Sequence, residues 1–233
     1  YRIFVKNSKT SHHLKTRLYR FNSTNNTNQS NFDDLYFLEY QLQKKLKINT
    51  NLISGSSFSY NESNSEIFGN TKHFGSNLSI YSQLEQKFYN RLNFSLGFRF
   101  EGYRLNNEEM KFRPVYRTGL NYKIDERTFI RTSYGLGFRY PTIAERYTAT
   151  STGDIRIFPN PNLKDETGWS AEIGIKRGFK ISSWSAYYDV ALFWTQYKDM
   201  IEFTFGYHNP DSVQLVAWPQ TDPNFFLNWV GFK

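Results

Sequence analysis

Cysteine is absent from this chain of 233 residues, which excludes a disulfide framework and any thiolate-bound metal site. No apolar run approaches the roughly 18–20 residues that a membrane-spanning helix needs, and the mean hydropathy is −0.65. The chain also lacks GxSxG, Walker A and complete GxGxxG motifs. Its histidines show no spacing typical of a zinc site; they are His12, His13, His73 and His208. We therefore expect no metal, no cofactor and no catalytic residues.

Aromatic residues, in contrast, are abundant. The chain holds 22 Phe, 17 Tyr and 5 Trp, which are difficult to place in a hydrophilic soluble protein. A transmembrane β-barrel uses such residues on its lipid face and in its two interfacial girdles. A barrel strand shows lipid only every second residue, so its average hydropathy stays low.

Apolar residues fall on every second position in three consecutive segments between residues 91 and 139. In the first segment they alternate with small, polar or charged residues; they are Leu92, Phe94, Leu96, Phe98 and Phe100. A period of two places the two sets on opposite faces of a strand. One apolar, aromatic face and one wet face predict an all-β, antiparallel transmembrane β-barrel.

Alternation and turn residues predict about eleven strands, at residues 1–6, 13–21, 33–46, 49–61, 71–88, 91–104, 112–124, 127–139, 167–179, 183–200 and 226–233. Short connections should alternate with long polar ones, at residues 22–32, 62–70, 105–111, 140–166 and 201–225. All long loops should then lie at one end of the barrel, which corresponds to the extracellular end in outer-membrane barrels. No segment fits an amphipathic helix well.

The net charge of +8 raises the question of nucleic-acid binding. Lysine and arginine are, however, spread over strands and turns instead of forming one basic block. We expect no nucleic-acid partner, and we expect most of these cations to line the lumen or to sit at strand ends.

The second half of the chain carries a series of motifs in a specific order. They are Tyr134-Gly-Leu-Gly-Phe-Arg-Tyr-Pro-Thr-Ile-Ala-Glu145, Pro159-Asn-Pro-Asn-Leu-Lys-Asp-Glu166 and Gly168-Trp-Ser-Ala-Glu-Ile-Gly-Ile-Lys176. This series resembles the barrel of TonB-dependent outer-membrane receptors. The matching positions are Gly137, Phe138, Arg139, Pro141, Glu145, Asn160, Pro161, Asn162, Leu163, Glu166 and Glu172. Residues 1–133 match this family only in the regular succession of strands and turns.

The resemblance implies a barrel of about 22 strands with a plugged lumen, of which residues 1–233 supply roughly half the strands and no plug domain. Both ends of the chain are expected to be incomplete. The implied partners are an inner-membrane energy-coupling protein of TonB type acting through the plug, a nutrient ligand, and outer-membrane lipid with lipopolysaccharide. A surface lipoprotein capping the barrel is left open as a further partner.

Several motif residues have a physical interpretation. Gly135, Gly137 and Gly174 should face the lumen, where a glycine leaves room for a plug or allows the wall to bend. Arg139 and Arg131 should meet Glu166 and Glu172 where two strands adjoin, either as luminal ion pairs or as separately solvated charges. The sequence leaves both alternatives open.

Candidate ligand-binding residues lie in the long loops, because loops on a rigid scaffold are where binding residues concentrate. Aromatic and arginine side chains, which are common anchors in interfaces, mark them; they are Arg139, Tyr140, Arg146, Tyr147, Arg156, Tyr207, His208 and Trp218. Loop packing or a surface facing lipopolysaccharide is the alternative for each.

The leading hypothesis is an active-transport receptor that imports a scarce nutrient such as an iron chelate, a vitamin, a glycan or a peptide. An outer-membrane enzyme would need a cluster of catalytic residues at the loop end, where we expect His208 to be the one histidine. A structural or adhesive barrel, or a subunit of a larger surface complex, remains the principal alternative.

Overall fold

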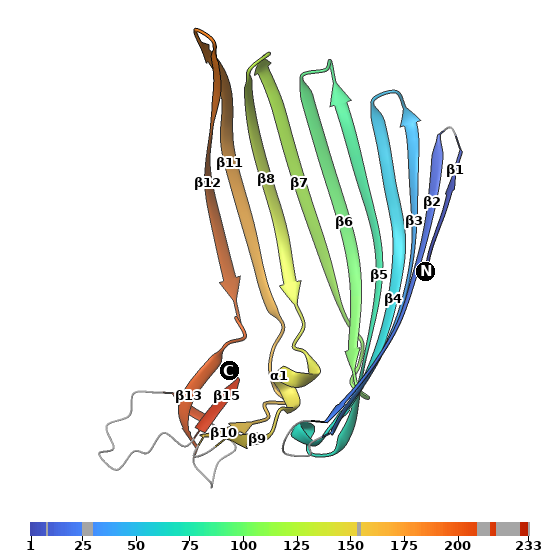
Figure 1. Cartoon of the computed structure of the whole chain (residues 1–233), viewed down its shortest axis with the longest axis vertical. Coiled ribbons are helices and arrows are strands. Elements are labelled where there is room, and N and C mark those ends of the chain that lie inside the picture. The colour runs from blue at the N-terminus through green and yellow to red at the C-terminus, as the bar shows by residue number, and fades with distance from the viewer. Residues whose placement is uncertain (8, 25–29, 153–154, 209–214, 218–228, 233) are drawn as a thin grey trace.

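A computed structural model describes residues 1–7, 9–24, 30–152, 155–208, 215–217 and 229–232. Its main feature is a ten-stranded sheet in the order β1-β2-β3-β4-β5-β6-β7-β8-β11-β12. All its neighbouring strands are antiparallel, and together they form a tall, curved wall of long hairpins (Figure 1). The all-β antiparallel fold class predicted from the alternation is therefore confirmed.

The strands of the wall are mostly longer than the ~5–6 residues usual in globular proteins. They are β1 (Arg2–Lys6), β2 (Thr10–Thr24), β3 (Ser30–Lys47), β4 (Thr50–Ser65), β5 (Thr71–Phe88), β6 (Leu92–Leu105), β7 (Lys111–Asp125), β8 (Thr128–Arg139), β11 (Glu166–Ile181) and β12 (Trp184–Lys198). The remaining elements are η1 (Glu66–Phe68), α1 (Ile143–Tyr147), β9 (Thr150–Thr152), β10 (Ile155–Phe158), β13 (Phe203–His208), β14 (Leu215–Ala217) and β15 (Trp229–Phe232).

The last predicted strand, at residues 226–233, is placed differently from our expectation. We expected it to continue the barrel wall after β12. Instead, β15 pairs in parallel with β10 and antiparallel with β13, within a second sheet of order β14-β13-β15-β10-β9. Period-two alternation identifies a strand but not its partner, so the sequence could not separate these two placements.

The two ends of the wall differ as predicted. Short turns join the strands at one end, whereas α1, η1 and the small sheet lie at the other (Figure 1). The turn after β5 has positive φ at both Tyr89 and Asn90, 47° and 54°, the backbone of a type I′ hairpin turn. No helix within the described ranges is long and apolar enough to cross a membrane.

The register places the apolar set on one face of the wall. Phe94 lies opposite Leu120, and Phe98 lies opposite Tyr116. These side chains stay open to the surroundings, with Phe98 51% exposed. The buried apolar side chains of the described residues instead lie at the long-loop end; they are Leu105, Tyr140, Ile143 and Leu163. An apolar face of this extent would favour aggregation in water. It therefore needs an apolar cover, which the hydrocarbon of a bilayer provides.

The other face of the wall is polar and internally bonded. Tyr81 on β5 reaches across β4 to donate a hydrogen bond to Glu39 on β3, over 2.9 Å. Gly55 on β4 makes this crossing possible, because a Cβ there would lie 2.6 Å from the Tyr81 ring. Glu39 also pairs with Lys15 on β2 at 2.8 Å. One polar network thus connects strands that are not neighbours.

Arg131 on β8 makes a second crossing of this kind. It pairs with Glu172 on β11 at 2.8 Å and with Asp189 on β12 at 2.6 Å. The guanidinium passes over Gly174, where a Cβ would lie 3.0 Å from its central carbon. The ion-pair alternative for Arg131 and Glu172 is therefore confirmed, and the space at Gly174 is used by an arginine of the wall itself.

A charge introduced on the apolar face should destabilise the barrel far more than the same charge on the polar face. For Phe98→Arg in the full-length protein we expect a loss of about 2–4 kcal/mol, the cost of an arginine facing lipid at mid-depth. Urea titration of the protein folded into lipid vesicles measures this difference.

Gln83→Arg is the matched control, because Gln83 lies opposite Gly97 on the polar face, one register position from Phe98 and its partner Ser82. We expect a change within about 0.5 kcal/mol for this variant. Equal losses for the two variants would contradict the assignment of the faces.

Candidate ligand-binding face at the long-loop end

Three connections meet at the long-loop end and form what we call the loop cluster. They are residues 66–70 with η1, residues 106–110 between β6 and β7, and the described residues 140–152 and 155–165, which include α1. The backbone N–H of Ala149 donates to the carbonyl of Ile67 over 2.6 Å, so the first and third connections touch directly. The cluster is built from contacts between loops that are distant in sequence.

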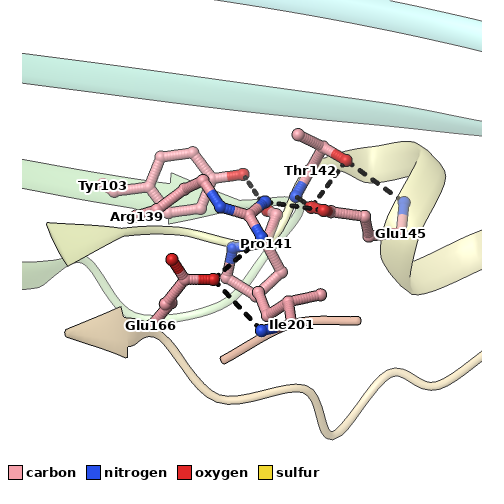
Figure 2. A network of polar contacts seen from close by, with 7 residues as sticks. All are labelled: Tyr103, Arg139, Pro141, Thr142, Glu145, Glu166 and Ile201. Atoms are coloured by element: carbon pink, nitrogen blue, oxygen red, sulfur yellow. Dashed lines mark hydrogen bonds and ion pairs between the residues drawn. The ribbon is translucent and has the colours of Figure 1, made fainter. Parts of the chain in front are cut away.

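Arg139, the last residue of β8, ties this cluster to the wall (Figure 2). Its Nη1 donates to Glu145 at 2.6 Å, and its Nη2 donates to Glu166, the first residue of β11, at 3.1 Å. The Glu166 carboxylate also accepts a hydrogen bond from the backbone N–H of Ile201, over 3.1 Å. One guanidinium therefore joins the end of β8, α1 and the start of β11, and Glu166 extends the network to the segment after β12.

A reciprocal capping box begins α1 (Figure 2). The Glu145 backbone N–H donates to the Thr142 hydroxyl at 3.2 Å, and the Thr142 backbone N–H donates to the Glu145 carboxylate at 2.7 Å. The sequence signal for this start was present as Thr-x-x-Glu. We predicted no helix here because a helix of five residues is too short to show an amphipathic period.

The charge of Glu145 is fixed by these contacts. Burial by itself raises the pKa of the Glu145 carboxyl, but hydrogen bonds from Thr142 and Arg139 outweigh burial, and the net pKa lies below the ordinary value of 4.5. The ionised form of Glu145 is therefore the form that holds α1 in place.

Arg146 is the most deeply buried cation of the cluster, with 3% of the residue exposed. Its guanidinium pairs with Glu108 of the β6–β7 connection and donates to the carbonyl of Leu163 over 3.2 Å. Leu163 itself is buried, at 5% exposure. Arg146 thus joins α1 both to a neighbouring connection and to the Asn-Pro-Asn-Leu turn.

Tyr147 and Tyr140 are likewise engaged within the cluster. The Tyr147 ring stacks on His73, with centroids 3.9 Å apart, and its hydroxyl accepts a hydrogen bond from Asn106. Tyr140 stacks on Tyr103 at 4.4 Å and donates to the carbonyl of Lys111 over 3.0 Å. Burial raises the pKa of the Tyr140 phenol above its ordinary value of 10.0, so this hydroxyl keeps its proton.

The Asn-Pro-Asn-Leu turn forms as its residue types predict. The side chain of Asn160 accepts a hydrogen bond from the backbone N–H of Asn162 over 3.2 Å. Asp165, which follows this turn, pairs with Arg113 on β7 at 3.0 Å. Pro161 lies between the two asparagines, and Pro141 is fully buried beneath the Tyr103 hydroxyl, which donates to its carbonyl over 3.3 Å.

The structure brings many of the predicted residues together. Of the motif residues, Arg139, Glu145 and Glu166 share one network, Glu172 belongs to the Arg131 network, and Gly137 lies opposite Gly168 on the polar face. Phe138 packs edge-on against Tyr140. The loops pack against one another through Tyr140, Arg146 and Tyr147, which is the loop-packing alternative stated for these residues above. Contact of the three side chains with a nutrient stays a prediction.

The side chains of the other four predicted binding residues are not among those that the structure describes. Arg156 belongs to β10, and Tyr207 and His208 belong to β13, but their side chains are not described. Trp218 lies outside the described residues. Their role in binding stays a prediction.

Several residues of the cluster were not singled out from the sequence. They are Tyr103, Asn106, Glu108, Thr142, Asp165 and, as a structural group, His73. Only Thr142 carried a usable signal, its capping box. The others act through contacts between segments distant in sequence, and such pairings have no local pattern. Arg146–Glu108 and Arg113–Asp165, for example, are 38 and 52 positions apart.

With this geometry in place, comparison with known proteins identifies the fold. The family described as TonB dependent receptor-like, beta-barrel matches residues 3–223. This chain belongs to that family. Its members are receptors of the bacterial outer membrane, and the ten-stranded sheet is a stretch of their transmembrane β-barrel.

Solved structures of TonB-dependent receptors share this fold at low sequence identity. The siderophore receptor PirA of Pseudomonas aeruginosa matches with a TM-score of 0.72 and 13% identity, over 98% of this chain and 42% of that chain. The hemophore receptor HasR of Serratia marcescens, solved with its hemophore HasA and heme, gives 0.66 and 14%, over 96% of this chain and 44% of that chain.

A curated relative is similar over a shorter stretch. "Hemoglobin-haptoglobin utilization protein B" of Neisseria meningitidis is 30% identical over 90 residues, which is 39% of this chain and 11% of that protein. The receptor chain described here thus spans only part of these proteins.

Removal of the Arg139 guanidinium should loosen the loop cluster of the receptor. Arg139→Gln leaves Glu145 and Glu166, whose side chains are 17% and 16% exposed, without a cation. We expect a loss of about 1–3 kcal/mol, below that for a fully buried pair because Arg139 is partly solvated. The matched control is Lys123→Gln, whose partner Glu126 is 87% exposed. A loss for Arg139→Gln no larger than for this control would argue against the network.

The loop cluster should become less stable at acid pH, because Glu145 then gains a proton. Because its folded pKa lies below 4.5, its contribution is complete above that pH and is lost as the pH falls through the folded value. Thermal unfolding of the full-length receptor between about pH 6 and pH 3 tests this. The Glu145→Gln variant should show a flatter profile there, and parallel profiles would exclude the contribution.

Proposed function

We propose that this chain forms part of the barrel wall of an outer-membrane active-transport receptor that imports an iron-containing nutrient. Residues 1–233 would form one part of a barrel of about 22 strands. A plug domain contributed by the rest of the protein would fill the lumen, and an inner-membrane protein of TonB type would supply the energy through that plug. Lipid and lipopolysaccharide would surround the apolar face.

The match to the receptor family over residues 3–223 is the observation that carries this proposal. The two faces of the wall support it. The polar face carries networks such as Lys15–Glu39–Tyr81 and Glu172–Arg131–Asp189, which suit a wet lumen, whereas the apolar face suits lipid. A receptor of this kind binds and releases its nutrient without chemical change, so we propose no enzymatic activity.

The names of related proteins favour iron over the vitamins, glycans and peptides that the sequence left open. They include a haemoglobin-haptoglobin utilization protein, a hemophore receptor bound to heme, a siderophore receptor and a ferric-catecholate import receptor. Binding is proposed at the long-loop end, through Arg139 and through Arg156, Tyr207, His208 and Trp218. Tyr140, Arg146 and Tyr147 are proposed to position these loops.

Uptake by cells tests the proposal directly. A strain that depends on the full-length receptor should take up radioactive iron from at least one of haem, haemoglobin, a ferric catecholate or ferric citrate. Uptake should stop when the proton gradient is collapsed. Removal of α1 by replacing residues 142–148 with a Gly-Ser linker should reduce uptake at least tenfold, because the loop cluster would lose its anchor.

A matched control replaces the short turn Tyr89–Asn90 with Asn-Gly, which suits the same turn type at the opposite end, and should leave uptake unchanged. Absence of uptake from every iron source, with normal assembly in the outer membrane, would refute the iron proposal. Tight capture of another protein without transport would instead support the adhesive alternative.

A further inference from the structure

His73 stands at the centre of the loop cluster, where all three connections meet. It is the third residue of β5 and is 5% exposed. Its ring stacks on Tyr147 of α1 at 3.9 Å with an angle of 14° between the planes, and Phe68 of η1 meets it edge-on at 6.1 Å. Asn106 of the β6–β7 connection lies 3.0 Å from its Nδ1.

The orientation of the Asn106 amide determines which protonation state His73 adopts. The backbone N–H of Phe74 donates to Asn106 Oδ1 over 3.0 Å, and the backbone N–H of Asn106 donates to the carbonyl of Phe74 over 2.7 Å. The Nδ2 group therefore faces His73 and Tyr147, and it can only donate. His73 Nδ1 must accept this bond, so the imidazole is neutral with its proton on Nε2.

Protonation of His73 is incompatible with this arrangement. The imidazolium is a donor at both ring nitrogens, so its Nδ1–H would point at the N–H groups of Asn106. Rotation of the amide would bring Oδ1 to the ring, but it would then set the amide NH₂ against the Phe74 N–H. Either way, one bond that ties Asn106 of the β6–β7 connection to β5 is lost.

We propose that His73 is an acid-sensitive latch of the loop cluster, which is closed when the imidazole is neutral and opens when it gains a proton. The latch would regulate the binding face assigned above, and to that extent it rests on the proposed function. Its opening would loosen the contact of Tyr147 of α1 with β5, because Asn106 bonds both His73 and the Tyr147 hydroxyl. The pair of Arg146 with Glu108 would still connect α1 to the β6–β7 connection.

The charged groups around His73 offer no compensation for an imidazolium. Four carboxylates of the adjoining elements have partners of their own and a fifth, Glu109, is exposed; no contact of these groups with the ring is found among the described residues. The pairs are Glu108 with Arg146, Glu62 with Lys72, Glu145 with Arg139, and Glu66 with the Ser30 backbone.

The buried surroundings of the His73 ring determine the pH range of the latch. A free imidazole titrates near pH ~6.5, and burial disfavours its charged form. The latch should therefore be closed at neutral pH and open progressively as the pH falls below about 6.5. The contribution of Glu145 is lost only below 4.5, and the Glu145→Gln variant distinguishes it from the latch.

Distance measurement between spin labels tests the latch in the full-length receptor. Labels at Ala144→Cys on α1 and Asn64→Cys on β4 use exposed positions, and this chain holds no native cysteine. We expect one narrow distance distribution at about pH 7.5 and at least a threefold larger share of longer distances at about pH 5.5. No ligand is present, so the result does not depend on transport.

Two variants separate a latch from a merely structural histidine. His73→Phe keeps the stacked ring but removes the titrating nitrogen, so its distribution should not change between the two pH values. Asn106→Asp offers a carboxylate that accepts from Nδ1–H of either the neutral or the protonated ring, so this variant should stay closed at both pH values. The aspartate tolerates the φ of 51° at this position. His13→Phe, on β2 near the short turns, is the control and should behave as wild type.

A wild-type distribution that is the same at both pH values, or an Asn106→Asp variant that opens in acid as wild type does, would overturn the latch. A pH response that is present in a receptor unable to take up any iron source would support the latch and refute only the proposed function. Uptake of iron without a pH response would refute the latch and support the proposed function.

Discussion

The structure depends on one constraint, which is that backbone N–H and C=O groups inside a bilayer have to be paired within the protein. Consecutive antiparallel strands meet this constraint along the whole wall, for example through fifteen successive residue pairs between β2 and β3. Long strands, short turns at one end and a fixed register follow. The register in turn sends Phe98 and Gln83 to opposite faces.

The wet face shows how such a wall keeps its charges satisfied. Tyr81 and Arg131 each cross an intervening strand at a glycine, Gly55 or Gly174, and reach acidic residues two strands away. Glycine in a strand is costly, but here it allows polar groups from three strands to bond to one another. The same reasoning applies at the strand ends, where Arg139 gathers Glu145 and Glu166 into one network.

Much of this could be predicted from the sequence, because the period of two is a local signal. It placed the strands of the wall and the short and long connections. For Arg139 and Glu166 the sequence left an ion pair as one of two alternatives, and the structure shows the pair. The placement of β15 in the small sheet, and the contacts of His73, Asn106 and Glu108, could not be predicted, because they join segments with no shared pattern. The capping box of Thr142 and Glu145 was readable, but α1 is too short to show a helical period.

An accessibility scan along β6 tests the central claim, that this chain is a membrane wall with one lipid face and one polar face. Spin labels placed singly at successive positions of Leu92–Leu105, in the full-length receptor in bilayers, would be probed with oxygen and with a water-soluble nickel chelate. We predict a period of two, with oxygen favoured at Leu96, Phe98 and Phe100. Uniform accessibility, or oxygen favoured at Gly97 and Arg99 instead, would contradict the account.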